Sequence, residues 1–76
     1  MAVLVGKDIM VDVRVDEVVV VADGKEHRIS RMEKLYGKIV KLAIDGLQAI
    51  TDLGNIEHYR ENMKCIKYLV TQHDTQ

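Results

Sequence analysis

The segment from Val18 to Ile29 constrains the fold of this 76-residue chain more than any other part of it. It begins with four consecutive valines and an alanine, and the crowded χ1 torsions of β-branched residues favour a strand over a helix. Asp23-Gly24 follows, and this pair readily adopts the positive φ angles that a type I′ hairpin turn requires. We therefore predict a β-hairpin in which Lys25–Ile29 returns along the valine strand and Val20 faces His27.

The residues before this hairpin predict further strands. From Ile9 to Val15, isoleucine and valine occupy every second position, as in a strand with one buried face. Ala2–Val5 is a short apolar run, and Gly6-Lys7-Asp8 can close a tight connection between the two strands. Asp16-Glu17 lacks the glycine of a tight turn, so both a turn and a bulge remain open there. We expect an antiparallel sheet of three to four strands over residues 1–29.

The remainder of the chain predicts two helices. Ser30-Arg31-Met32-Glu33 matches a capping box, in which the serine and glutamate side chains each bond a backbone amide of the first turn. The first helix is expected over 30–53, and its apolar residues, Met32 among them, cover too wide an arc for one neighbouring element to bury. Leu53-Gly54-Asn55 then matches a helix stop followed by an N-cap. The second helix is expected over 55–71, with an apolar seam suited to one neighbour, and 72–76 should fray.

These elements predict an α+β fold: one domain over residues 1–76, in which an antiparallel sheet precedes an αα-hairpin packed on one of its faces. A chain of this size buries only roughly 60% of the surface that its unfolded form exposes. The sequence has no Phe or Trp, so the core must consist of Val, Ile, Leu and Met. Thin cores are often supplemented by disulfides, metals or self-association. The single cysteine excludes an intramolecular disulfide, so we expect a homodimer.

Side chains that could perform catalysis or bind a metal are scattered along the chain. His27, His58 and His73 fall on a strand, a helix and the expected tail. His58 and Cys65 are separated by two helical turns, about 10.5 Å of rise, which is too far to share one ion without two further ligands. Glu61 lies one turn before Cys65, and a neighbouring carboxylate disfavours a reactive thiolate. We expect a non-enzymatic protein with no catalytic residue, no metal and no cofactor.

Basic residues follow the last strand and continue along the first helix. The candidate basic patch consists of Arg28, Arg31, Lys34, Lys38 and Lys41. Such a stripe could contact a phosphate backbone. However, Asp45 and Asp52 share the polar side of the helix, no aromatic residue is interleaved for base stacking, and the net charge of the chain is −1. Nucleic-acid binding is therefore the less favoured alternative.

Apolar residues left over after the expected packing indicate a protein interface. The first helix can bury much of its arc between the sheet and the second helix, but not all of it. The candidate interface residues are Val19, Val21, Tyr36, Val40 and Ile44. We expect a homodimeric interaction module that regulates or inhibits another protein, and stand-alone chains of this kind are often accessory, viral or mobile-element proteins. A small-molecule sensor with its site at the dimer seam is a further alternative.

The sequence also bears on location. The N-terminal apolar run turns polar at Lys7 and Asp8, so it lacks the length of a signal peptide or a membrane span. A single cysteine without a partner suits a reducing compartment. We therefore expect a cytoplasmic protein that does not enter a membrane.

Overall fold

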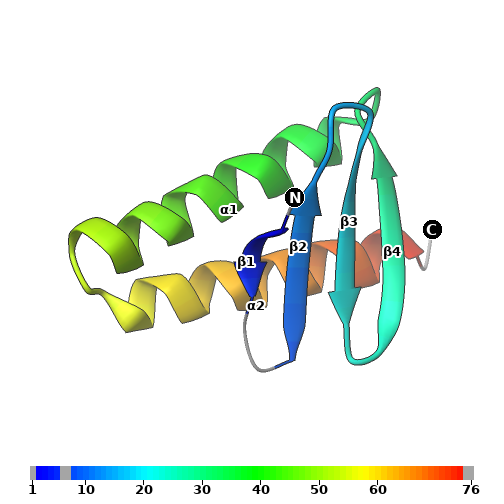
Figure 1. The fold of residues 1–76 in the computed structure, drawn as a ribbon. Helices are drawn as coiled ribbons and strands as arrows, with labels where there is room; N and C mark the ends of the chain where they lie inside the picture. The colour runs from blue at the N-terminus through cyan, green and yellow to red at the C-terminus, as the bar shows by residue number, and fades with distance from the viewer. Residues whose placement is uncertain (1, 6–7, 75–76) are drawn as a thin grey trace.

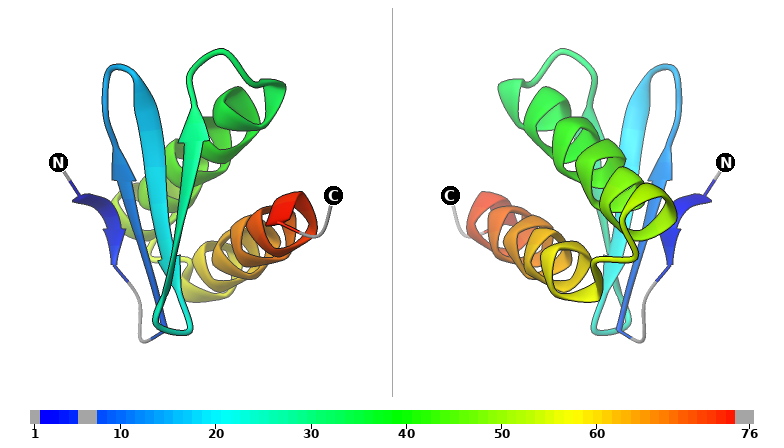
Figure 2. Two further views of the ribbon diagram at one scale, coloured as in Figure 1. Left: turned by 90° about the vertical axis from the view of Figure 1, so that its right-hand side faces the viewer. Right: turned by 90° about the vertical axis from the view of Figure 1, so that its left-hand side faces the viewer.

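The computed structural model describes residues 2–5 and 8–74. The elements follow in the order β1 (Ala2–Val5), β2 (Ile9–Val13), β3 (Glu17–Ala22), β4 (Lys25–Ser30), α1 (Lys34–Asp52) and α2 (Ile56–Asp74), as Figure 1 shows. The strands form a four-stranded antiparallel sheet in sequence order. The two helices form an αα-hairpin that covers one face of the sheet and leaves the other face open (Figure 2). The predicted α+β fold is confirmed.

The β3–β4 hairpin has the predicted turn and register. Asp23 and Gly24 both have positive φ angles, 53° and 75°. Val20 pairs with His27 across the hairpin, so both side chains point to the same face of the sheet. β3 has buried side chains on both faces, because Val18, Val19 and Val20 are all buried.

The β2–β3 connection is a turn rather than a bulge. β2 ends at Val13, and the Arg14 amide donates a hydrogen bond of 2.9 Å to the Glu17 carbonyl. Glu17 already belongs to β3. Val15 therefore lies in the turn and is 81% exposed, so the expectation that the alternating strand continues to Val15 is wrong. β1 pairs with β2 as predicted, whereas the connection through Gly6 and Lys7 lies outside the described residues.

The first helix begins at Lys34, later than the predicted start at residue 30. Ser30 still belongs to β4, where it pairs with Glu17, and this pairing keeps its backbone extended. The Ser30 amide does donate to Glu33 Oε2, at 3.1 Å, but Ser30 Oγ accepts from the Met32 amide, at 3.2 Å. These bonds close a turn before the helix. Met32, expected on the apolar face of the helix, lies in this turn and is 93% exposed.

The connection between the helices has the predicted chemistry, but α2 is longer than expected. Gly54 adopts a positive φ of 62°, and Asn55 Oδ1 accepts a 3.1 Å hydrogen bond from the His58 amide, as an N-cap does. α2 extends to Asp74, so its expected end at residue 71 and the fraying of 72–74 are wrong. Contacts from His73 and Asp74 to distant parts of the chain hold this last turn in place.

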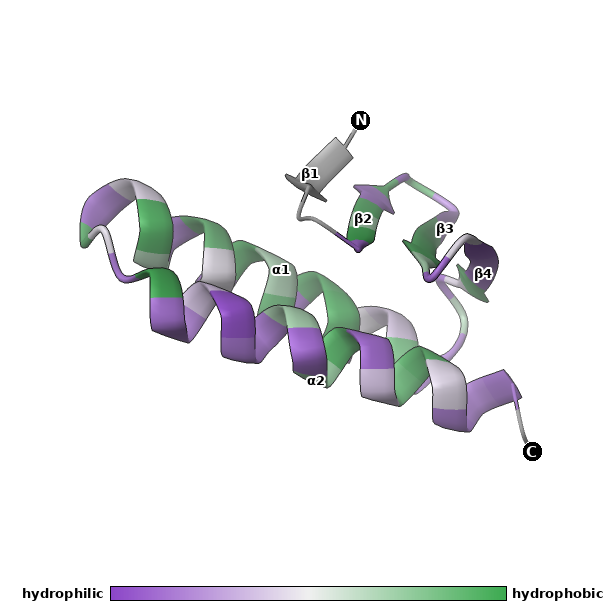
Figure 3. Cartoon of the chain, turned by 90° about the horizontal axis from the view of Figure 1, so that it is seen from below, coloured by the Kyte–Doolittle hydropathy of each residue, from purple (hydrophilic) through white to green (hydrophobic). Residues whose placement is uncertain are grey.

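The hydrophobic core lies between the sheet and the helix pair. Its completely buried large side chains are Val11, Val18, Val20, Ile29, Ile39, Ile66 and Val70. α1 carries more hydrophobic residues than α2, as Figure 3 shows from below, and both helices extend past the sheet on the side of β1. Part of the apolar surface of α1 has no neighbour within the described chain, as the exposures of Ile44 (48%) and Leu47 (39%) show.

Neither of the two described helices combines the length and the hydrophobicity that a membrane span requires.

Candidate functional site

Two of the predicted interface residues, Val19 and Val21, lie on the open face of the sheet. Val19 is only 4% exposed, and its neighbours across the sheet are Asp12 and Arg28. Charged side chains join into a network around it, with ion pairs Arg14–Asp12 (3.1 Å), Arg14–Glu17 (3.1 Å), Arg28–Glu17 (2.7 Å) and Arg28–Glu26 (2.6 Å). The aliphatic stems of long charged residues can cover apolar surface in this way. Val19 is therefore closed to a partner, and Val21 is half-buried.

The other three predicted interface residues lie on α1, on the opposite side of the sheet. Tyr36 is half-buried, and its hydroxyl donates a 2.7 Å hydrogen bond to the Arg14 carbonyl. Val40 is half-buried, and Ile44 is 48% exposed. The structure thus does not bring the predicted residues together into one surface, because Val19 and Val21 are separated from α1 by the sheet itself.

Gly37, Val40, Ile44 and Leu47 form an apolar line along α1, which we call the α1 seam. Their spacing of three, four and three residues keeps them on one side of the helix, as at the a and d positions of a heptad. Sequence reasoning placed Val40 and Ile44 in the candidate interface but left out Gly37 and Leu47. Continuing the same spacing by one step in each direction would have found both.

The predicted basic patch is divided by the fold. Arg28 lies on the open face of the sheet, where Glu17 and Glu26 neutralise it. Lys34, Lys38 and Lys41 are exposed on α1, and no other residue in the described part of the chain forms an ion pair with them. Arg31 lies in the turn that precedes the helix. Within the predicted patch, Arg31 and the three lysines of α1 therefore keep a positive charge that has no ion-pair partner among the described residues.

An interhelical groove runs between α1 and α2 on the side away from the core. It has a volume of about 560 Å³ and is lined by Lys38, Lys41, Leu42, Asp45, Cys65 and Leu69. Leu42 and Leu69 supply apolar surface from the two helices, and Cys65 is an exposed free thiol between them. Sequence reasoning did not predict this groove, because it depends on the register between the two helices. That register becomes available only when the turn at Gly54 and the packing of both helices are known.

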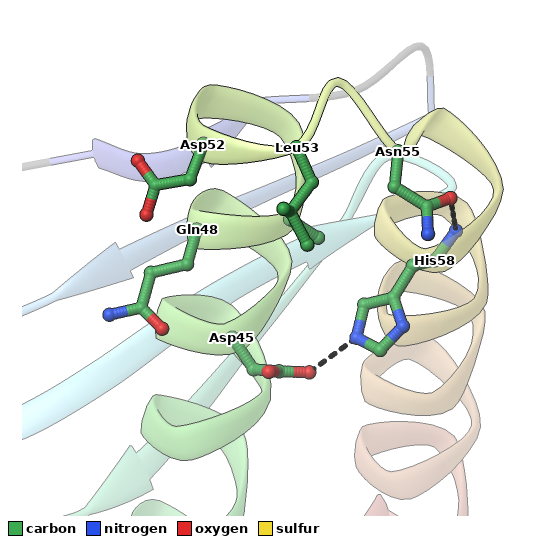
Figure 4. Close-up of a pocket in the computed structure, with 7 residues that line it drawn as sticks. Asp45, Gln48, Asp52, Leu53, Asn55 and His58 are labelled. Carbon is green, nitrogen blue, oxygen red and sulfur yellow. Dashed lines mark hydrogen bonds and ion pairs between the residues drawn. The ribbon is translucent and has the colours of Figure 1, made fainter.

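Asp45 occupies one end of the groove and is already bonded within the chain. Figure 4 shows its carboxylate directed at His58, with Oδ2 2.5 Å from His58 Nε2. Asn62 Nδ2 donates to the same oxygen, at 2.9 Å, and to the Leu42 carbonyl, at 3.0 Å. The hydrogen bond from His58, followed by that from Asn62, lowers the pKa of Asp45, so this carboxylate stays ionised at neutral pH.

The Asp45–His58 pair also borders a smaller pocket at the end of the helix hairpin, of about 270 Å³. A histidine paired with a carboxylate can activate a hydroxyl or thiol nucleophile placed within hydrogen-bond reach. The other described residues that line this pocket are Gln48, Ala49, Asp52, Leu53 and Asn55, and none of them carries a hydroxyl or a thiol. Within residues 2–5 and 8–74, no group of three or more His, Cys, Asp or Glu is placed to hold a metal ion. The pair is best described as a polar link between the helices.

The end of α2 is fastened by a second polar cluster, which we call the C-terminal latch. His73 Nε2 lies 2.7 Å from Glu33 Oε1, and this hydrogen bond raises the pKa of His73. His27, 5% exposed beneath the helix end, has Nδ1 2.7 Å from Asp74 Oδ2, although the two are not aligned for a hydrogen bond. Lys25 Nζ lies 3.3 Å from the same oxygen. Burial acts to raise the pKa of Asp74, but Lys25 and His27 together outweigh it and lower that pKa.

The C-terminal latch predicts that the stability of the fold depends on pH. Because folding raises the pKa of His73 above its ordinary value of 6.5, the stability that its protonated form contributes is complete below about pH 6.5 and is lost as the pH rises through the raised pKa. A double-mutant cycle with His73→Gln and Glu33→Gln, measured by urea unfolding at about pH 5.5 and about pH 8.5, should show a larger coupling energy at the lower pH. A coupling that grows towards alkaline pH would contradict this assignment.

Comparison with known proteins adds no relative: no protein-family model matches the chain, and no curated protein or solved structure matches it.

Proposed function

We propose that this chain is a non-enzymatic interaction module that acts as a homodimer and regulates or inhibits another protein by binding it. The observation that supports target binding best is the interhelical groove, where apolar residues of both helices lie beside two lysines without ion-pair partners among the described residues. Concave apolar surface with a few convergent charges is typical of a binding site. A non-enzymatic role is supported by the pocket beside Asp45 and His58, because none of the other described residues that line it carries a hydroxyl or a thiol for this pair to activate.

The chemistry of the groove indicates an acidic amphipathic segment as the target. Apolar side chains of such a segment would contact Leu42 and Leu69, and its carboxylates would pair with Lys38 and Lys41. Asp45 should repel a carboxylate at its own end of the groove, since its charge is retained at neutral pH. We therefore expect the acidic residues of the target to lie towards Lys38, which gives the segment a defined direction.

A synthetic helical peptide with leucines and glutamates at helical spacing provides a direct test. The peptide should shift the amide NMR signals of residues around Leu42 and Leu69 in the wild-type protein. Lys38→Glu replaces an attraction with a repulsion, so it should weaken binding about tenfold, which corresponds to about 1.4 kcal/mol. The same peptide with glutamines in place of the glutamates should bind more weakly to the wild type and be insensitive to Lys38→Glu.

Lys64→Glu is the matched control, because it makes the same charge change on α2 outside the groove. Lys64 instead lines a separate hollow together with Arg60 and Lys67. Binding should therefore be little affected by Lys64→Glu. A larger loss with Lys64→Glu than with Lys38→Glu would place the peptide in that hollow and contradict the groove as the target site.

Nucleic acid remains a second candidate partner, because Lys34, Lys38 and Lys41 have no ion-pair partner in the described chain. Neutralisation of Arg28 by Glu17 and Glu26 speaks against it. The affinity for a duplex or single-stranded oligonucleotide would fall steeply with salt, in proportion to the number of phosphates contacted, whereas an apolar peptide contact would persist. Tight, strongly salt-dependent oligonucleotide binding that Lys38→Glu abolishes would favour this alternative.

A further inference from the structure

We infer that two copies of this chain pair through the α1 seam, with the two α1 helices antiparallel. The inference rests on the homodimer of the proposed function and adds its surface and its orientation. The seam lies to one side of the buried stripe of α1, which contains Ile39 and Ala43. Its a/d spacing is that of helices that pack along a shared line, yet Ile44 is 48% exposed and Leu47 39% exposed in the single chain.

Gly37 gives an independent reason to place a partner at the seam. Glycine destabilises the interior of a helix, and close approach of a neighbour is the usual compensation. Within the described chain no such neighbour is present: apart from its sequence neighbours and the backbone of its own helix, a Cβ built on Gly37 would have no heavy atom within 4 Å. The packing of the single chain therefore does not account for glycine at this position, whereas a second helix lying against the seam does.

Antiparallel pairing matches the seam residues in size. If the two-fold axis crosses the seam midway between Val40 and Ile44, Gly37 lies opposite the partner's Leu47, and Val40 lies opposite the partner's Ile44. The open space beside Gly37 then receives the largest exposed side chain at the other end of the seam. In a parallel pair, Gly37 would instead face the partner's Gly37 and leave a gap. The sizes of the four seam residues thus favour the antiparallel arrangement.

The charges that flank the seam favour the same orientation. Lys34 lies in the first turn of α1, and Asp52 lies in its last turn. Antiparallel pairing brings Lys34 of each helix close to Asp52 of the other, whereas parallel pairing places like charges together. The helix dipoles also oppose each other favourably only when the helices are antiparallel. This charge complementarity identifies a second copy of α1 as the occupant.

Disulfide trapping tests the orientation. In a Cys65→Ser background, one chain carries Val40→Cys and a second, differently tagged chain carries Ile44→Cys. Antiparallel pairing places these two positions opposite each other, so oxidation of the mixture should yield mainly the mixed disulfide. Like positions are then offset by about 6 Å along the axis in addition to an interhelical distance of 8–10 Å, which is too far for a disulfide. Tyr68→Cys, on an exposed position of α2, is the control for random collision.

The possible outcomes separate the orientation of the two helices from the existence of the dimer. Mainly mixed disulfide, with Tyr68→Cys unlinked, supports the antiparallel seam. Like-with-like products, or no trapping while light scattering still shows a dimer of the Cys65→Ser protein, would overturn this arrangement and leave the proposed homodimer standing. A monomer at high micromolar concentration, for both the Cys65→Ser protein and the wild type, would overturn the homodimer together with the seam.

Discussion

Replacing Ile39 with alanine should lower the free energy of unfolding by about 2–5 kcal/mol, whereas the same replacement at Ile44 should change it by less than about 1 kcal/mol. Both residues are isoleucines within α1, so the effect of the substitution on helix propensity is the same. They differ in their surroundings: Ile39 is completely buried against the core, and Ile44 is 48% exposed. The loss at Ile39 combines the lost burial of the side chain with the cavity that it leaves.

Urea unfolding at a protein concentration low enough to keep the chain monomeric measures this contrast. Measurements at high concentration add a second readout, because Ile44→Ala should then reduce the dimer population while Ile39→Ala should not alter the interface itself. Equal losses at low concentration would mean that Ile44 is as well packed within the single chain as Ile39. In that case the α1 seam would not be a free surface.

The elements that sequence reasoning predicted correctly are those set by neighbouring residues. The β3–β4 hairpin depends on the conformational preferences of Asp23 and Gly24. The start of α2 depends on the hydrogen bond that Asn55 Oδ1 accepts from the amide three residues later. Both interactions are local, so the residue types alone determine them. The antiparallel sheet and the helical hairpin follow from these turns, because short connections place consecutive elements side by side.

The errors occur where a distant residue overrides a local preference. Ser30 and Glu33 form part of the expected capping interaction, but pairing with Glu17 of β3 holds Ser30 in the sheet and delays the helix. The last turn of α2 would fray in isolation, and it is ordered by His27 and Glu33, which lie 40 residues or more earlier in the chain. Sequence spacing contains no signal for either contact.

The candidate surfaces were predictable only in part, for the same reason. Alternation along β4 already places Arg28 on the opposite face from His27, so its separation from the lysines of α1 could have been inferred from the sequence. The charged network around Val19 could not, since Arg14, Glu17 and Arg28 come together only when the strands are paired. The interhelical groove also depends on a contact register that residue types alone do not specify.

Gly37→Leu should have opposite effects on the single chain and on the dimer. In the single chain, leucine replaces the poorer helix former and meets no heavy atom within 4 Å at its Cβ, so the free energy of unfolding should rise by about 0.8 kcal/mol. In the dimer, the new side chain would occupy the space assigned to the partner's Leu47. Overpacking costs about 1–3 kcal/mol per site, and symmetry creates two sites, so the dissociation constant should rise at least about thirtyfold.

Gly37→Ala is the matched control for this prediction, because a methyl group improves helix propensity by a similar amount but fills much less of the space at the seam. Urea unfolding of dilute protein should therefore show stabilisation by both substitutions, and sedimentation equilibrium should show dissociation chiefly with leucine. Such a divergence separates a residue kept for association from one tolerated on a solvent-facing helix. If leucine stabilises the chain and leaves its self-association unchanged, Gly37 does not lie at a subunit interface, and the space beside it must have another explanation.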